Sequence, residues 1–126
     1  MTKKILLVED NVNLSDMYAE ILRDEGYEVV TVDDGVEAEE LIKNESWDLL
    51  LLDIMLPKLD GISILTDMVK ENKINGRPVI IISNVNEQDL VQQCLNLGVK
   101  DFMVKAEISL DLLLKKISDY LSNEQH

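Results

Sequence analysis

The sequence is short of cysteine, of long apolar runs and of basic residues, and each shortage excludes a class of protein. The single cysteine, Cys94, cannot form an internal disulfide, which fits a reducing compartment. No apolar run approaches the ~20 residues that span a bilayer, and Ile5–Val8 is too short for the core of a signal peptide. Only 12 Lys and Arg stand against 25 Asp and Glu, which gives a formal net charge of −13. We therefore expect no membrane partner and no direct nucleic acid binding, because phosphate backbones require clustered Lys and Arg.

Short apolar runs alternate along the chain with segments of helical spacing. The runs are continuous rather than alternating with polar residues, which is typical of strands buried on both faces. The expected strands are 5–8, 29–32, 49–52, 79–82 and 102–104, and the expected helices are 12–24, 36–43, 62–70, 87–97 and 110–121. This order predicts an α/β fold with a parallel sheet covered by helices on both faces. We expect one domain over residues 1–122 and a C-terminal tail at 123–126.

Two local expectations concern the helices. In the first helix, we expect five apolar residues to share the buried face, namely Leu14, Met17, Tyr18, Ile21 and Leu22. In the last helix, Ser109 stands where an N-cap belongs.

Four of the five expected strands end in polar side chains that we expect to share one crevice. They are Glu9 and Asp10 after the first strand, Asp53 after the third, Ser83 after the fourth and Lys105 after the fifth. In an open parallel sheet, ligands bind beyond the carboxyl ends of the strands, so we expect these side chains to converge. Asp33-Asp34 follows the second strand and is interpreted as a solvated loop.

Three carboxylates in one crevice repel each other unless a cation lies among them. Mg²⁺ (or Mn²⁺) suits such a site, because it takes oxygen ligands and needs only one or two carboxylates together with a phosphate. A carboxylate such as Asp53, held beside a divalent cation and the Lys105 ammonium, can attack phosphorus. The hydroxyl of Ser83 can donate to a phosphoryl oxygen. The strand ends therefore predict metal-dependent transfer of a phosphoryl group to a carboxylate.

Motifs over essentially the whole chain resemble those of bacterial two-component response regulator receiver domains. They are ILLVED at 5–10, LLLDIMLP at 50–57 followed by Asp60-Gly61, IIIS at 80–83 and DFMVK at 101–105. The resemblance implies a (βα)5 flavodoxin-like sheet of strand order 2-1-3-4-5. It also implies a cytoplasmic signalling switch, phosphorylated by a sensor histidine kinase, a phosphotransfer protein or a small phosphodonor. Such a domain is no enzyme beyond its own phosphorylation and dephosphorylation.

The resemblance assigns roles to the residues at the strand ends. Asp53 is implied to be the phosphoacceptor, and Lys105 is implied to pair with the phosphoryl group. Asp10, Asp53 and the main-chain carbonyl of Met55 are implied to bind Mg²⁺ directly, with Glu9 acting through a water.

The resemblance also implies an output face. Ser83 matches the hydroxyl that moves toward the phosphoryl group, and Phe102 matches the aromatic residue that turns inward with it. The switch then acts through helix 87–97, strand 102–104 and helix 110–121. That face would contact a downstream protein or an output domain, and a phosphorylation-dependent dimer is compatible with it.

Several residues depart from the family pattern. Ala106 replaces the usual proline after Lys105, so we expect a trans peptide bond there, because a cis bond without proline costs ~3–4 kcal/mol. Asn84 is larger than the residue that usually follows the switch hydroxyl. Met55 and Val85 are apolar and cannot hold a hydrolytic water, so we predict a long-lived phosphoryl group.

Two other functions fit the sequence less well. A haloacid-dehalogenase-type aspartyl phosphatase needs a second acid two residues after its nucleophile, and that position is Met55. A flavodoxin-like cofactor binder needs a Gly/Ser/Thr-rich phosphate loop after the first strand. Here the loop begins with Glu9-Asp10, an acidic pair that repels a cofactor phosphate.

Overall fold

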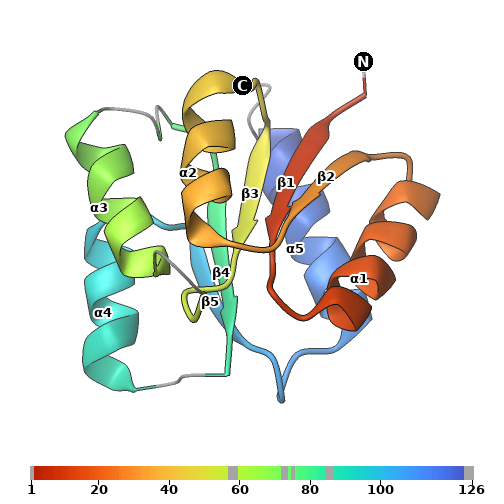
Figure 1. Cartoon of the computed structure of the whole chain (residues 1–126). Helices are drawn as coiled ribbons and strands as arrows, with labels where there is room; N and C mark the ends of the chain where they lie inside the picture. The colour runs from red at the N-terminus through yellow and green to blue at the C-terminus, as the bar shows by residue number, and fades with distance from the viewer. Residues whose placement is uncertain (1, 57–59, 72–73, 75, 85–86, 124–126) are drawn as a thin grey trace.

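The computed structural model describes residues 2–56, 60–71, 74, 76–84 and 87–123. Its centre is a single parallel sheet in the order β2-β1-β3-β4-β5 (Figure 1). The strands are β1 (Lys4–Val8), β2 (Glu28–Val32), β3 (Leu49–Leu52), β4 (Val79–Ser83) and β5 (Asp101–Val104). Each neighbouring pair is parallel, so the fold class and strand order expected from the sequence are confirmed.

Helices cover both faces of the sheet. They are α1 (Val12–Asp24), α2 (Gly35–Asn44), α3 (Gly61–Lys70), α4 (Gln88–Asn96) and α5 (Leu110–Asn123). Buried residues of α1 and α5 pack on one face, and those of α2, α3 and α4 pack on the other. No helix in the described ranges is long and apolar enough to cross a membrane.

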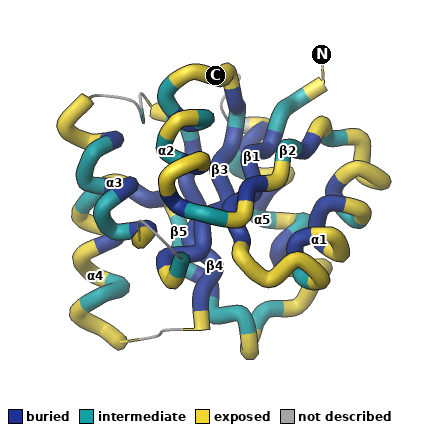
Figure 2. The backbone as a smooth tube through the Cα atoms, in the orientation of Figure 1, coloured by how far each residue is buried: buried dark blue, intermediate teal, exposed yellow. Residues whose placement is uncertain are grey.

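The central strands are buried on both sides, as Figure 2 shows by their dark colour. Alternate residues of β3 enter opposite cores: Leu50 and Leu52 pack under α2, α3 and α4, whereas Leu49 and Leu51 pack under α1 and α5. A strand that feeds two cores has no polar face, because successive side chains point to opposite sides. This explains the continuous apolar runs in the sequence.

Side-chain caps begin four of the helices and fix where each one starts. Asn11 accepts from the Leu14 amide, Asp34 from Glu37, Asp60 from Ser63 and Ser109 from Leu112, at 2.9–3.1 Å. The predicted Ser109 cap is therefore confirmed. The interpretation of Asp34 as part of a merely solvated loop is incomplete, because its carboxylate caps α2.

Two helix details differ from expectation. Met17 is 40% exposed, so its placement on the buried face of α1 is wrong. The buried residues Ser15, Tyr18 and Leu22 define that face, and a side chain one residue before Tyr18 is turned away from it by about 100°. In addition, α5 continues to Asn123, one residue into the predicted tail, and residues 124–126 lie outside the described ranges.

Candidate functional site

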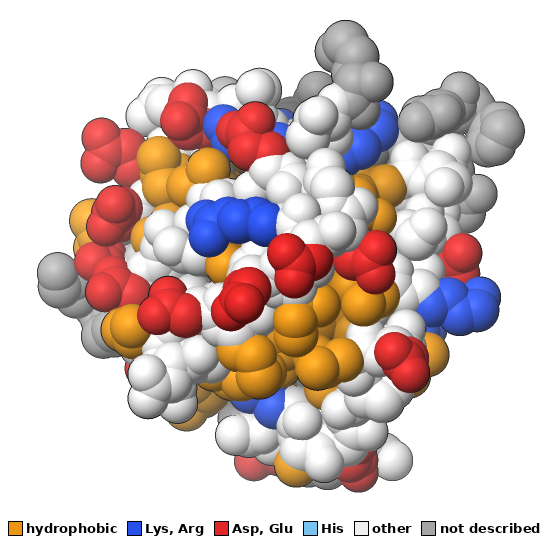
Figure 3. All heavy atoms as spheres, turned by 90° about the vertical axis from the view of Figure 1, so that its right-hand side faces the viewer, with side chains coloured by type: hydrophobic (Ala, Val, Ile, Leu, Met, Phe, Trp, Pro, Cys, Tyr) orange, Lys and Arg blue, Asp and Glu red, His pale blue; other side chains and the backbone are white. Residues whose placement is uncertain are grey.

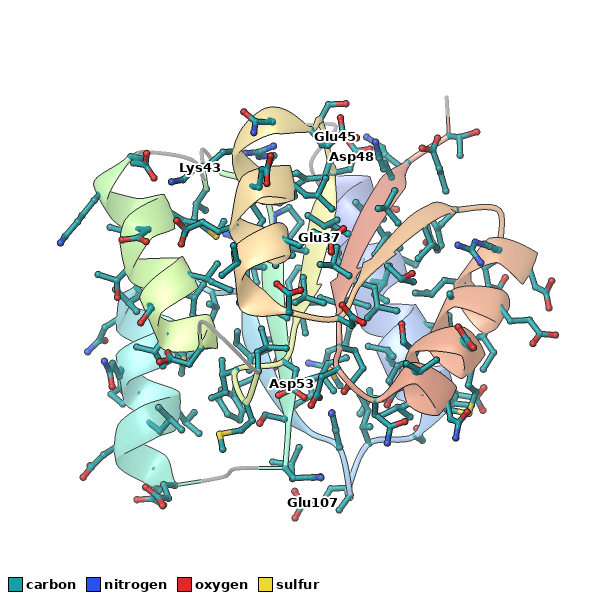
Figure 4. All side chains as sticks on the ribbon, viewed as in Figure 1. Glu37, Lys43, Glu45, Asp48, Asp53 and Glu107 are labelled. Carbon is teal, nitrogen blue, oxygen red and sulfur yellow. The ribbon has the colours of Figure 1, made fainter. Side chains whose placement is uncertain are left out.

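The carboxyl ends of the strands bring three carboxylates to one edge of the sheet. Oxygens of Glu9, Asp10 and Asp53 all lie within 4.8 Å of one another. Glu9 and Asp53 are only 2% and 5% exposed, whereas Asp10 is open to solvent. Figure 4 shows Asp53 at the lower end of β3, on the side where the chain leaves the sheet. The predicted convergence of these acids is therefore present.

Main-chain hydrogen bonds extend the sheet one residue beyond the strands and fix these acids in place. The Glu9 amide donates to the Val32 carbonyl at 2.9 Å, and the Asp53 amide donates to the Val8 carbonyl at 3.0 Å. The Lys105 amide donates to the Ser83 carbonyl at 2.9 Å in the same way. The side chains thus project from rigid strand ends rather than from free loops.

Lys105 links the two buried carboxylates. Its Nζ lies 2.7 Å from Asp53 Oδ2 and 2.5 Å from Glu9 Oε1. The strand-end argument predicted the first contact. It did not predict the second, because nothing in the Glu9-Asp10 pair indicates which acid faces the sheet and which faces solvent.

The second oxygen of each buried carboxylate accepts a main-chain hydrogen bond. Asp53 Oδ1 accepts from the Met55 amide at 2.9 Å, and Glu9 Oε2 accepts from the Asn11 amide at 3.1 Å. Both oxygens of each carboxylate therefore have a partner. The side chain of Met55 is 61% exposed beside the site.

Burial and charge act in opposite directions on these groups. Burial raises the pKa of Glu9 above its ordinary value, although the hydrogen bond from Lys105 offsets part of that rise. Burial alone lowers the pKa of Lys105, but its hydrogen bonds to Asp53 and Glu9 raise the pKa overall, so the ammonium stays charged. One ammonium among three carboxylates leaves the pocket net negative, and the three carboxylates are hard oxygen donors. This donor set fits Mg²⁺ or Mn²⁺.

The two residues assigned to switching lie on neighbouring strands. Ser83 is fully buried at the end of β4. Phe102 is half-buried on β5, pairs in register with Ile81 and packs against the core under α2, α3 and α4. Asn84 is exposed, and Val85 lies outside the described residues. No peptide bond in the described part of the chain is cis, so the expected trans bond after Lys105 is confirmed.

Gly61, the first residue of α3, lies against the backbone of Ile54. The Gly61 amide donates to the Ile54 carbonyl at 3.0 Å. A Cβ at position 61 would lie 2.5 Å from the Ile54 Cα, closer than real Cβ atoms approach backbone. Glycine is therefore required here, and the contact holds the chain on either side of Met55.

Comparisons with known proteins identify the family. A model of the response regulator receiver domain matches residues 5–118. The chain is 33% identical to the transcriptional regulatory protein CrdR of Helicobacter pylori over 98% of its own length, but spans only 57% of that regulator. A receiver domain protein (CheY-like) from Methanospirillum hungatei superposes with a TM-score of 0.91 at 30% identity, covering 99% of this chain and 98% of the other. The receiver domain of the Pseudomonas aeruginosa sensor histidine kinase PA1611, solved with a magnesium ion in its active site cleft, matches with a TM-score of 0.85 at 28% identity, covering 97% and 99%.

Proposed function

This chain belongs to the response regulator receiver domains, which accept phosphoryl groups in two-component signalling, and on that premise we propose that Asp53 is its phosphoacceptor. The observation that carries the proposal is the position of Asp53 at the end of the central strand. There its carboxylate faces the Lys105 ammonium at 2.7 Å and two further acids within 4.8 Å. A carboxylate in such surroundings is a nucleophile for phosphorus.

A divalent metal belongs to the proposal. We assign Asp10, Asp53 and the Met55 carbonyl as direct ligands of Mg²⁺ (or Mn²⁺), with Glu9 acting through a water. The magnesium ion in the PA1611 receiver supports this assignment, as does the net negative charge of the pocket here. When bound, the ion neutralises charge on the oxygens of the transferring group.

Three groups of the chain have separate roles in the proposed phosphoryl transfer. A carboxylate oxygen of Asp53 attacks phosphorus, and the bond from phosphorus to the donor breaks with its electron pair leaving on the donor. Lys105, which bridges Asp53 and Glu9 before the reaction, pairs with a phosphoryl oxygen afterward. The Met55 amide, already 2.9 Å from Asp53 Oδ1, holds the carboxylate in a fixed orientation during the attack.

The output is proposed to leave through α4, β5 and α5. When the Ser83 hydroxyl moves toward the phosphoryl group, Phe102 on the neighbouring strand turns inward. Phe102 and Leu112 line a cavity of about 230 Å³ between β5 and α5, which its movement would reshape. The bound partner is a downstream protein or an output domain, or a second copy of the phosphorylated chain.

The compartment and the phosphodonor of the switch are inferred from its membership of the receiver domain family. We propose that it works in the cytoplasm, with a sensor histidine kinase or a phosphotransfer protein as phosphodonor. The proposed chemistry is confined to the domain's own phosphorylation and dephosphorylation.

Metal binding tests the assigned ligands. Asp10→Asn should weaken Mg²⁺ binding by more than about tenfold while the far-ultraviolet circular dichroism stays unchanged, because a charged ligand is lost from an exposed position. The control is Asp24→Asn, which removes the same charge from the far end of α1. If Asp10→Asn binds Mg²⁺ as the native chain does, the ligand assignment is wrong.

A further inference from the structure

Tyr18 belongs to the inner face of α1. Figure 3 views the molecule from the side on which α1 lies in Figure 1, and it shows acidic side chains beside an apolar area on the outer surface. Tyr18 is no part of that surface, because it is only 5% exposed. It lies in the core between the sheet, α1 and α5, which also contains Leu7 of β1 and Met103 of β5. The proposed phosphoryl transfer gives this buried tyrosine no role.

The strands place charged groups of the phosphoacceptor site next to this core. Successive side chains of a strand alternate between its two faces, and Leu7 and Met103 both face α1 and α5. Two residues further along their strands stand Glu9 and Lys105, where main-chain hydrogen bonds still continue the sheet. Glu9 and Lys105 therefore lie at the carboxyl end of the same core that contains Tyr18.

The direction of α1 turns the tyrosine toward that end of the core. The helix starts at Val12, soon after Glu9, and runs back along the sheet, so its N-terminal turn lies nearest the carboxyl ends of the strands (Figure 1). Long side chains on a helix lean toward the N-terminus of the helix. Because Tyr18 stands in the second turn, its ring extends toward the site and its hydroxyl lies at the ring's far end.

The charges that act on the Tyr18 hydroxyl agree with this placement. Burial raises the pKa of Tyr18, while the positive charge of Lys105 acts to lower it and the negative charge of Glu9 acts to raise it. The hydroxyl makes no hydrogen bond to any residue that the structure describes. It is also not among the buried polar atoms that lack a partner, so water can reach it. The hydroxyl can therefore exchange water for a partner in the site.

We propose that Tyr18 is a positioning residue of the phosphorylated state, whose hydroxyl donates a hydrogen bond to Glu9 when Lys105 turns to the phosphoryl group. The inference rests on the proposed phosphorylation of Asp53. Before phosphorylation, one oxygen of Glu9 has Lys105 as its partner and the other accepts from the Asn11 amide. Glu9 is only 2% exposed, and a buried carboxylate oxygen that loses its donor destabilises the state that leaves it unpaired. A neutral donor at this place offsets that loss.

The test compares Tyr18→Phe with Tyr27→Phe in the full chain. Each change removes one hydroxyl and keeps the ring, but Tyr27 precedes β2 at the opposite end of the sheet, where its hydroxyl bonds to Ser118. Mg²⁺ is titrated first, and beryllofluoride, an analogue of the phosphoryl group, is then titrated in saturating Mg²⁺. Tyr18→Phe should weaken binding of the analogue by about tenfold, as loss of a hydrogen bond to a charged group does, and keep Mg²⁺ affinity within about twofold. Tyr27→Phe should change neither affinity.

A spectroscopic signal separates this role from a merely structural one. The carbon resonance of the tyrosine Cζ responds when the hydroxyl donates to a carboxylate, and the resonance of Tyr18 is the one missing from Tyr18→Phe. It should shift when the analogue binds to the native chain, whereas the resonance of Tyr27 should not.

Three results would overturn the inference. They are an unshifted Tyr18 resonance, equal analogue affinity in the two variants, and an equal loss of Mg²⁺ and analogue affinity in Tyr18→Phe, which would mean that Tyr18 shapes the unphosphorylated site. Each of these leaves the assignment of Asp53 intact, because the native chain still binds the analogue. If the native chain does not bind the analogue, the proposed phosphorylation itself fails, and the inference fails with it.

Discussion

Each buried carboxylate of the site gives one oxygen to Lys105 and the other to a main-chain amide. This arrangement leaves Glu9 and Asp53 no freedom to rotate, and it makes Lys105 the group that balances both charges. Such two-point support is what preorganises a nucleophile. Among the described residues, none gives the exposed Asp10 comparable support, which suits a ligand that receives the metal from solvent.

Gly61 is a residue whose replacement should affect the site from a distance. Gly61→Ala places a Cβ against the Ile54 backbone, and overpacking of this kind costs about 1–3 kcal/mol of unfolding free energy. Because the contact holds the segment that contains Met55, Mg²⁺ affinity should fall as well. Urea unfolding and metal titration measure the two effects.

Gly26→Ala is the matched control for that substitution. Gly26 has a φ of +96° with nothing within 4 Å of an added Cβ, so alanine costs about 1–2 kcal/mol through backbone strain alone. Its Mg²⁺ affinity should be unchanged. If the two alanine variants bind Mg²⁺ equally well, the Gly61 contact does not shape the site.

The exposed Met55 is expected to prolong the life of the phosphoryl group. A thioether cannot hold an attacking water, whereas an amide or a carboxylate can. Met55→Asn and Val85→Glu should therefore each speed phosphoryl loss, measured as the decay of phosphorylated chain after the donor is removed. Met17→Asn, the same change at an exposed methionine on α1, should not. If the phosphoryl group decays at the native rate in both Met55→Asn and Val85→Glu, the apolar residues at these positions do not set its lifetime.

At the scale of elements, apolar patterns predicted the sheet well and the helix faces less well. The run 49–52 matches β3 without error, because a strand buried on both sides needs an apolar residue at every position. Met17 was misplaced because an apolar residue on a helix can lie outside the buried face, which only packing against the sheet defines. The exposed Val36, Leu95 and Leu110 show the same effect.

Strands β4 and β5 with helices α4 and α5 are expected to respond together to phosphorylation. Ser83 and Phe102 lie on paired strands, so a shift of the hydroxyl biases a two-state element above them. Adding a phosphoryl analogue should move amide resonances at 83–95 and 100–114. Ser83→Ala should confine the shifts to the neighbourhood of Asp53, whereas Ser46→Ala, in an exposed loop, should not. If the phosphoryl analogue shifts only amides close to Asp53 in the native chain, α4, β5 and α5 do not form the output face.

At the scale of the whole molecule, the fold could be predicted because element order and strand-end chemistry are both local in the sequence. The strand order came from the family resemblance rather than from the pattern. The Glu9–Lys105 contact could not be predicted, since it depends on how elements far apart in the chain pack.

The most direct test of the account is the identity of the phosphorylated residue. The native chain is incubated with a small phosphodonor, with and without Mg²⁺, and the modified peptide is identified by mass spectrometry. The account predicts one phosphoryl group on Asp53, dependent on Mg²⁺ and absent from Asp53→Asn. A phosphoryl group on another residue, or undiminished labelling of Asp53→Asn, would contradict the proposal that Asp53 is the phosphoacceptor.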